Sequence, residues 1–214
     1  MTAVDELAPA AVLVNSAAPL ILASGSETRA NILRAAGLQF TIERPAVDEE
    51  GTKLSLRAAK ASPAEIAETL AELKAQRVSV RHPDAHIIGA DQVLDCHSES
   101  FDKPETAAEA LDQLRRLRGK QHQLISAVVV VKDRQILWHH VDSATLTMRH
   151  CSDDFLRRYV QAMGDSVLSS VGGYQIEGLG AQLFSTTHGD HFTILGLPLL
   201  PLLGFLRDTG ILRE

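Results

Sequence analysis

Cysteine is scarce in this sequence, and there is no excess of basic residues. Two cysteines among 214 residues, Cys96 and Cys151, cannot build a disulfide framework or a zinc site by themselves. The 21 basic and 27 acidic residues leave a net charge of −6, so no broad positive surface is available to hold a polyanion. We therefore expect no nucleic acid polymer as a partner, whereas a small anion needs only a few focused cations.

Long apolar runs are also missing. The most apolar stretch, residues 195–206, is interrupted by Pro198 and Pro201 and is shorter than the roughly 18 residues that a membrane span needs. The beginning of the sequence carries Asp5 and Glu6 instead of the basic start of a secretory signal. We expect a cytoplasmic protein that has no membrane partner.

The overall composition is that of a globular protein, with 45% hydrophobic residues and a mean hydropathy near zero. Residues 1–18 are rich in alanine and lack a clear periodicity, so we expect a loose leader there. The remaining residues, 19–210, are expected to form a single domain.

The first ordered segment is expected to be a strand, a loop and a helix. Residues 20–23 are an apolar run that ends at Ser24, and apolar residues then recur at helical spacing until Gly37. Ser26 is placed to cap this helix and Gly37 to end it. The amides of the loop and the positive end of the helix dipole therefore converge on one point, which favours an anion.

The next two elements bring charged residues together. Ser62 begins a capping box for a helix in which Lys74 lies beside the apolar face. Residues 86–90 then read as a buried strand that delivers Asp91 and Gln92 at its C-terminal end, where open α/β sheets place ligands.

The rest of the chain predicts further helices, strands and a loop. The expected helices are a helix that opens at Asp102 and closes at Gly119, a helix that begins after Ser152, and a last helix over 198–208. The expected strands are 124–131, 136–141, 144–148 and two short strands around 188–190. Residues 172–180 contain too many glycines for a helix and read as a loop.

Four segments in this order resemble the Maf-like family of nucleotide pyrophosphatases. They are LASGSETRANIL (22–33), IIGADQV (87–93), DKPET (102–106) and GGYQIEGLGA with GLPL (172–199). The resemblance extends over residues 20–208. It implies a mixed α/β sheet with flanking helices and two lobes around a central cleft, as in inosine-triphosphate-pyrophosphatase-like folds. It also implies hydrolysis of a nucleoside triphosphate to a monophosphate and pyrophosphate.

The resemblance assigns phosphate binding to the first loop. Its Ser-x-Ser pattern falls on Ser24 and Ser26, and Arg29 lies one helical turn further on as a charge-assisted clamp. The alternative for Ser26 is a purely structural role as a helix cap.

The resemblance also assigns the catalytic and metal-binding groups. Asp91 matches the catalytic aspartate, which either accepts a proton from the attacking water or holds a divalent cation, Mg²⁺ or Mn²⁺. Glu49 matches a second acid that faces the cleft, and its alternative is a solvated acidic loop. Lys74 and Lys103 match two lysines that stabilise the leaving pyrophosphate, although lysines at such positions are often simply solvated.

Three positions depart from the commonest family pattern and bear on the base. Thr28 replaces an arginine, Gln92 replaces a threonine and Glu177 replaces a glutamine, and the last two resemble the branch that cleaves 7-methyl-GTP. A carboxylate accepts two parallel hydrogen bonds, which suits the N1–H and amino group of guanine better than the edge of thymine or uracil. Trp138 and Tyr174 are candidates for stacking on a base, although a tyrosine at this position fits the core equally well.

Asp102 and Ser170 also depart from the pattern, where the family has a glycine and a lysine. Either change could alter metal dependence or turnover.

Two other functions remain open at this point. One is a dTTP/UTP pyrophosphatase, and the other is a nucleotide-binding regulator of cell division without turnover. A dinucleotide oxidoreductase is excluded because no G-x-G-x-x-G follows the first strand. The apolar C-terminal helix would permit a homodimer.

Overall fold

The computed structural model of the chain describes residues 19–212. The strands are β1 (Leu20–Ala23), β2 (Thr41–Ile42), β3 (His86–Cys96), β4 (Glu99–Phe101), β5 (Gln121–Lys132), β6 (Gln135–Met148) and β7 (Phe184–His188). The α-helices are α1 (Glu27–Ala35), α2 (Glu49–Ala58), α3 (Pro63–Ser79), α4 (Ala107–Leu117), α5 (Asp153–Met163), α6 (His191–Ile194) and α7 (Leu199–Asp208). The described residues also form the short 3₁₀-helices η2 (Gly164–Leu168), η3 (Val171–Gly173) and η4 (Leu179–Leu183).

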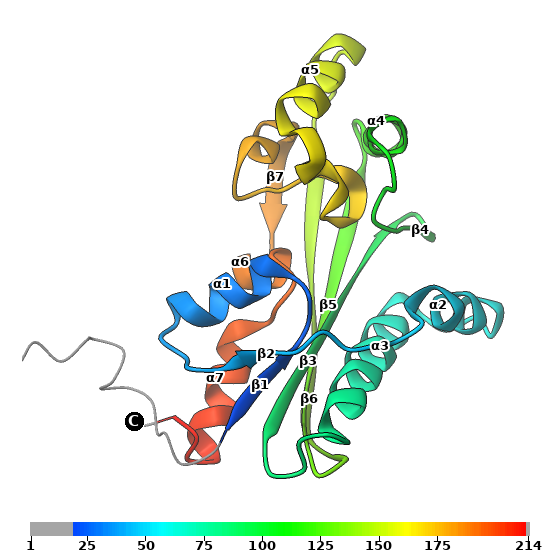
Figure 1. Cartoon of the computed structure of the whole chain (residues 1–214). Helices are drawn as coiled ribbons and strands as arrows, with labels where there is room; N and C mark the ends of the chain where they lie inside the picture. Colours follow the sequence, from blue (N-terminus) through cyan, green and yellow to red (C-terminus); the bar gives the residue numbers. More distant parts are fainter. Residues whose placement is uncertain (1–18, 213–214) are drawn as a thin grey trace, which may run out of the picture.

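A mixed, seven-stranded sheet organises these residues, and this confirms the predicted fold class. Its order is β2-β1-β3-β5-β6-β7, with β4 paired to β3. Strand β1 is parallel to β2 and β3, and the other pairs are antiparallel. Strands β3, β5 and β6 are the longest, so they run through the molecule from end to end (Figure 1).

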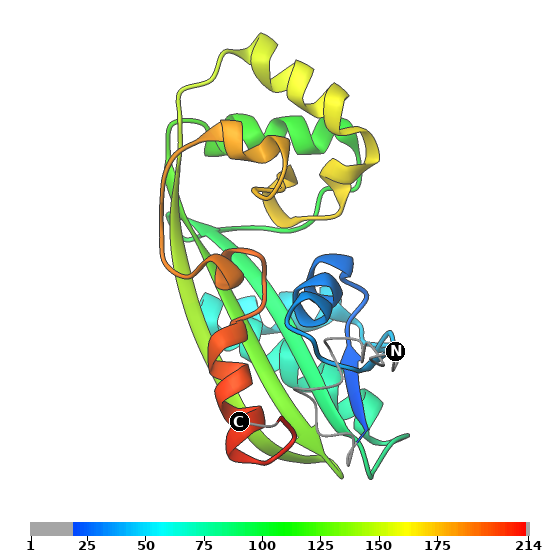
Figure 2. The ribbon, with the colours of Figure 1, turned by 90° about the vertical axis from the view of Figure 1, so that its left-hand side faces the viewer.

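Helices cover both faces of the sheet. Helices α1 and α7 pack on one face over an apolar cluster that includes Leu22, Ile88 and Leu202, and α3 packs on the other face. At the far end of the long strands, α4, α5 and the 3₁₀-helices gather around a third cluster (Figure 2). The long strands thus connect two groups of helices.

Several predicted helix ends are confirmed. Ser26 accepts a hydrogen bond from the amide of Arg29 at the start of α1, and Gly37 ends this helix with a positive φ of 79°. Ser62 and Glu65 form the expected capping box of α3.

Strand β3 is longer than expected. Asp91 does not end the strand, because β3 continues to Cys96 through antiparallel pairing with β5 and β4. The parallel neighbour β1 stops at Ala23, which pairs with Gly89. Asp91 therefore lies just beyond the end of β1, where the sheet loses its neighbour on that side.

Other element predictions were also wrong. The strands expected over 136–141 and 144–148 are one strand, β6. Helix α4 begins at Ala107 rather than at Asp102, because the Thr106 side chain caps it by accepting from the amide of Glu109. The second strand expected near residue 190 is the short helix α6, since the Asp190 carboxylate accepts from the amides of Phe192 and Thr193. Residues 172–180 form an irregular segment that includes parts of η3 and η4.

Within residues 19–212, no helix combines the length and the apolar character that crossing a bilayer requires. The expected leader, residues 1–18, lies outside the described residues. The division into this leader and a two-lobed domain over 19–210 stays a prediction.

Candidate active site

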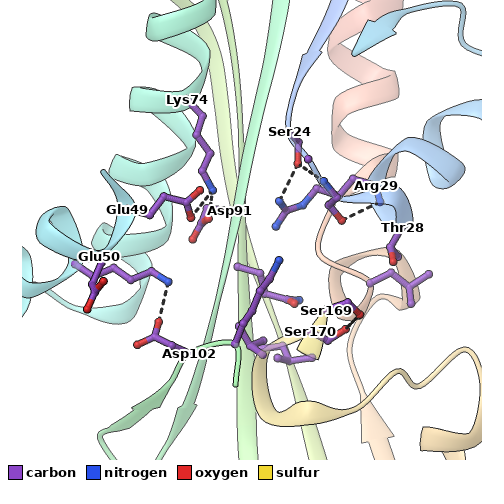
Figure 3. Close-up of a pocket in the computed structure, with 18 of the residues that line it drawn as sticks. Ser24, Thr28, Arg29, Glu49, Glu50, Lys74, Asp91, Asp102, Ser169 and Ser170 are labelled. Atoms are coloured by element: carbon purple, nitrogen blue, oxygen red, sulfur yellow. Dashed lines mark hydrogen bonds and ion pairs between the residues drawn. The ribbon is translucent and has the colours of Figure 1, made fainter. Parts of the chain in front are cut away.

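A cavity of about 830 Å³ opens beside the middle of β3. All ten residues predicted for the site line it: Ser24, Ser26, Thr28, Arg29, Glu49, Lys74, Asp91, Gln92, Lys103 and Glu177. These residues come from α1, α2, α3, β3 and three loops, so the fold brings together positions far apart in the sequence (Figure 3). Their chemical roles stay predictions.

The loop after β1 forms one wall of the cavity. The Ser24 hydroxyl is buried and accepts hydrogen bonds from the amide of Ser26, at 3.1 Å, and from Nη1 of Arg29, at 3.3 Å. Arg29 Nε donates to the carbonyl oxygen of Gly196 at 2.8 Å, which fixes the guanidinium across the loop. Burial lowers the pKa of Arg29, and the charges of Asp91 and Glu49 offset part of that shift. The guanidinium stays charged, so this wall presents a fixed cation.

Lys74 joins two carboxylates on the opposite wall. Its Nζ lies 2.6 Å from Oδ1 of Asp91 and 3.0 Å from Oε2 of Glu49. Lys74 and Asp91 are each only 5% exposed, whereas Glu49 is partly open to solvent. Oδ2 of Asp91 is buried and has no hydrogen-bond partner. A buried carboxylate oxygen without a donor favours a cation or an ordered water at this point.

The carboxylates in the cavity fit a divalent cation whose remaining ligands are supplied by the substrate. Within residues 19–212 no cluster of three or more His, Cys, Asp and Glu side chains is arranged to hold a metal ion. Asp91 and Glu49 provide two carboxylates, and Mg²⁺ typically binds through one or two carboxylates together with substrate phosphates. These residues therefore suit an ion that arrives with a phosphate chain.

Lys103 adds a further positive charge to the cavity. Its side chain is accessible, yet desolvation lowers its pKa, and the charges of Arg29 and Lys74 lower it further. Glu49 and Asp91 act in the opposite direction. The two acids and the three cations are thus close enough to influence one another.

Gln92 is fixed by its amide nitrogen. Nε2 donates to the hydroxyl of Ser126 at 3.0 Å and to the carbonyl oxygens of Thr193 and Ile194 at 3.1 and 3.0 Å. Two carbonyl acceptors require the NH₂ group on this side, so Oε1 is the end of the amide that these contacts leave free. Asp91 and Gln92 are neighbours in β3 and point to opposite faces of the sheet, yet both line the cavity.

Part of the cavity lining is apolar. Leu124, Val171, Ile176 and Leu195 line the cavity, and Glu177, which follows Ile176, is an exposed lining residue. Tyr174 also lines the cavity, but it is a buried residue whose hydroxyl lies 2.8 Å from Nε2 of His122. This surface is suited to a flat, partly apolar group.

Trp138 was wrong as a candidate for stacking on a base. It packs parallel to Phe205 of α7, with ring centroids 5.2 Å apart, and is not among the lining residues. The pairing of β6 with β5 places it away from the cavity.

Sequence reasoning missed three cations that line the cavity. Lys53 and Arg57 of α2 both form ion pairs with Asp102, at 2.7 and 3.0 Å. Burial alone would raise the pKa of the Asp102 carboxyl, but its bonds to Lys53 and Arg57 outweigh burial and lower the pKa. Arg44 lies against Gly25, with Nε 3.5 Å from where a β-carbon would be. The spacing of Glu49, Lys53 and Arg57 by four residues was the available signal for α2.

A family model and several curated proteins match this chain over most of its length. The model of the family described as "Maf-like protein" matches residues 19–209. A nucleoside triphosphate pyrophosphatase of Paramagnetospirillum magneticum is 55% identical over 89% of this chain and 98% of its own length. Another, from Granulibacter bethesdensis, is 50% identical over 88% of this chain and 96% of its own. A 7-methyl-GTP pyrophosphatase of Rhizobium etli is 47% identical over 89% of this chain and 96% of its own.

Proposed function

This chain belongs to the Maf-like protein family, and we propose that it hydrolyses 7-methyl-GTP between the α and β phosphates. It is a nucleotide pyrophosphatase, an activity named for relatives such as those of Paramagnetospirillum magneticum and Granulibacter bethesdensis. The products are the nucleoside monophosphate and pyrophosphate. The observation that carries the proposal is the Asp91–Lys74–Glu49 cluster, which faces Ser24 and Arg29 in one cavity.

The reaction needs the triphosphate to be held while water attacks the α phosphorus. The bond from the α phosphorus to the bridging oxygen breaks, and that oxygen leaves with the pyrophosphate. Ser24, Ser26 and Arg29 bind phosphate oxygens through hydroxyl, amide and guanidinium donors. Lys103 balances the negative charge that builds up on the leaving group, and groups of this kind typically contribute about 100- to 1,000-fold in rate.

Asp91 is the group placed to act on the attacking water. Its Oδ1 accepts a hydrogen bond from Nζ of Lys74, which fixes the orientation of the carboxylate. Its Oδ2 has no partner in the protein and is therefore available to orient the water or receive its proton.

Members of this family are generally dependent on a divalent metal. Asp91 and Glu49 are the residues that would hold Mg²⁺ or Mn²⁺ here. When bound, such an ion neutralises phosphate charge and makes a coordinated water more acidic. The ion pairs of Lys74 with Asp91 and Glu49 keep these two carboxylates close together, where both can bind the cation.

The base preference rests on Glu177 and Gln92. A carboxylate at Glu177 accepts from the N1–H and the amino group of guanine, and the positive charge that N7 methylation adds favours an anionic partner. The free Oε1 of Gln92 supplies a second fixed acceptor. One such bidentate contact discriminates between bases by about 1–3 kcal/mol.

The test is a nucleotide panel that includes 7-methyl-GTP, GTP, dTTP, UTP and ATP, with pyrophosphate measured in the presence of Mg²⁺ or Mn²⁺. We expect the highest kcat/KM for 7-methyl-GTP, and a shift toward dTTP and UTP for Glu177→Gln. A preference for dTTP or UTP in the unaltered enzyme would overturn the base assignment. Tight nucleotide binding without pyrophosphate release would instead support a binding protein without turnover.

Asp91→Asn separates the two roles of this carboxylate. Loss of a metal ligand raises the Mg²⁺ concentration needed for half-maximal activity, whereas loss of the proton acceptor lowers kcat even at saturating Mg²⁺. Asp154→Asn is the matched control, because Asp154 is an exposed carboxylate that pairs with Arg158 on α5. Full activity of Asp91→Asn would remove the proposed site.

A further inference from the structure

Helix α2 forms a wall of the cavity although it has no buried side chain. Leu56 is its partly buried apolar contact with the core, whereas Leu54 is 70% exposed. A short helix with so little apolar contact gains little stability from packing. The position of α2 must therefore depend on its polar contacts.

Those polar contacts lie on one face of α2. Glu49, Lys53 and Arg57 are spaced by four residues, which places them one above another along the helix. Glu49 pairs with Lys74 (Figure 3), while Lys53 and Arg57 both pair with Asp102. Each oxygen of the Asp102 carboxylate contacts a different cation, Oδ1 with Lys53 and Oδ2 with Arg57.

Asp102 is itself held to α4 through its backbone. Its carbonyl oxygen accepts a hydrogen bond of 3.1 Å from Nε2 of Gln113, a buried residue of α4. The next residue is Lys103, which lines the cavity. Asp102 thus connects the helix that carries Glu49 to the segment that carries Lys103.

We propose that Asp102 is a positioning residue that fixes Glu49 and Lys103 relative to each other by anchoring α2 to the segment that precedes α4. This inference rests on the proposed function, because the spacing matters for catalysis only if both residues act on a triphosphate. Asp102 also offsets one of the two positive charges of Lys53 and Arg57, which would otherwise be free to attract phosphate. Removal of its charge should therefore lower kcat while nucleotide affinity stays the same or increases.

The kinetic test is Asp102→Asn in the full chain, with the best nucleotide of the panel and saturating Mg²⁺. Because small displacements of catalytic groups are costly, we expect kcat to fall about 10- to 100-fold. KM should stay unchanged or fall. Asp102→Glu keeps the charge and should recover part of kcat, while Asp154→Asn should match the unaltered enzyme. An unchanged kcat, or a loss confined to a higher KM, would overturn the proposal.

Hydrogen exchange tests the anchoring without any reaction. In the nucleotide-free protein, Asp102→Asn should increase exchange of the amides in residues 49–58 and leave those in 153–163 unchanged. Lys53→Gln removes one of the two ion pairs from the other side and should increase exchange in α2 in the same way. Exchange in α2 that both variants leave unchanged would refute the anchoring. If no nucleotide is hydrolysed, the proposed function fails, and this measurement still decides whether Asp102 holds α2.

Discussion

At the scale of single residues, the Lys74–Asp91 pair is better explained by function than by stability. Both side chains are almost fully buried, and removing two charges from water costs much of what their attraction returns. One oxygen of Asp91 also lacks a partner, which a purely structural ion pair would satisfy. Buried charges with incomplete hydrogen bonding are concentrated at functional sites, where a ligand or a reacting group supplies the missing contacts.

The lowered pKa of Lys103 leads to a prediction of how activity depends on pH. Its pKa is lowered by desolvation and by the neighbouring cations, so it loses its charge at a lower pH than an ordinary lysine. The cationic form is present below that pKa, and activity should therefore fall as pH rises through it. Lys103→Arg keeps its charge, so the alkaline limb of kcat/KM against pH should move upward.

The measurement is kcat/KM from pH 7 to 10.5, at constant ionic strength and saturating Mg²⁺. Lys120→Arg is the matched control, because Lys120 is an exposed lysine outside the cavity. Superimposable alkaline limbs for Lys103→Arg and the unaltered enzyme would contradict a role for the Lys103 charge.

At the scale of elements, the site depends on how closely α3 approaches β3. Gly89 allows this approach, since a β-carbon there would lie 2.1 Å from the carbonyl oxygen of Ala71 and 2.8 Å from the β-carbon of Ala75. Lys74 belongs to the same stretch of α3, and Asp91 lies two residues beyond Gly89. The contact between the helix and the strand thus sets the distance between Lys74 and Asp91.

Gly89→Ala should therefore reduce both stability and activity. The added methyl group pushes α3 away from β3, and overpacking of this kind typically costs about 1–3 kcal/mol in the free energy of unfolding. Urea unfolding and kcat measure the two effects. Gly204→Ala in α7 is the control, because nothing lies within 4 Å of the added carbon and the change should be neutral or stabilising. Equal unfolding midpoints for the two variants would show that the approach is not tight.

Elements with strong local signals could be predicted from the sequence. The caps at Ser26 and Ser62 act on neighbouring amides, and these contacts need no distant partner. Helix α2 was missed because it buries no side chain and so has no apolar face to recognise. The continuation of β3 beyond Asp91 depends on pairing with β5, which is about 35 residues away in the chain.

The site could be predicted only where motifs carried the information. The resemblance supplied Asp91, Lys74 and Lys103, and the structure places all three in one cavity. Motifs do not indicate that Asp102 pairs with Lys53 and Arg57, because such ion pairs form between segments that only the folded chain brings together. The charges could be read from the sequence, but their partners could not.

At the scale of the whole molecule, the long strands should make the described part of the chain unfold as one unit. His122 lies near the start of β5, beside the cluster around α4 and α5, and it contacts Tyr174 and Phe184 there. Trp138 pairs with Val130 near the other end of β5 and packs on Phe205 of α7. Val130 follows His122 by eight residues, which separates them by about 26 Å along a strand. Because the same strands support both ends, a loss of stability at His122 should reach Trp138.

Acidification should reduce the stability of the folded chain at His122. Burial lowers the pKa of His122 to about 4, from 6.5 for an exposed histidine, so the unfolded chain binds a proton between these values while the folded chain does not. The contribution of the neutral His122 side chain to stability is complete above pH 6.5. As pH falls toward 4, this contribution is lost, and the free energy of unfolding decreases by about 3 kcal/mol. His122→Gln retains a hydrogen-bonding group for the Tyr174 hydroxyl but cannot be protonated, so its stability should depend less on pH. His188→Gln, at an exposed residue, should keep the full dependence of stability on pH.

Urea titrations at pH 7 and pH 5 measure both effects. They are followed by far-UV circular dichroism and by the fluorescence of Trp138, the single tryptophan. Separate midpoints for the two signals would show that the ends of the sheet unfold independently, whereas coincident midpoints that shift together in His122→Gln are expected if the long strands make them one unit.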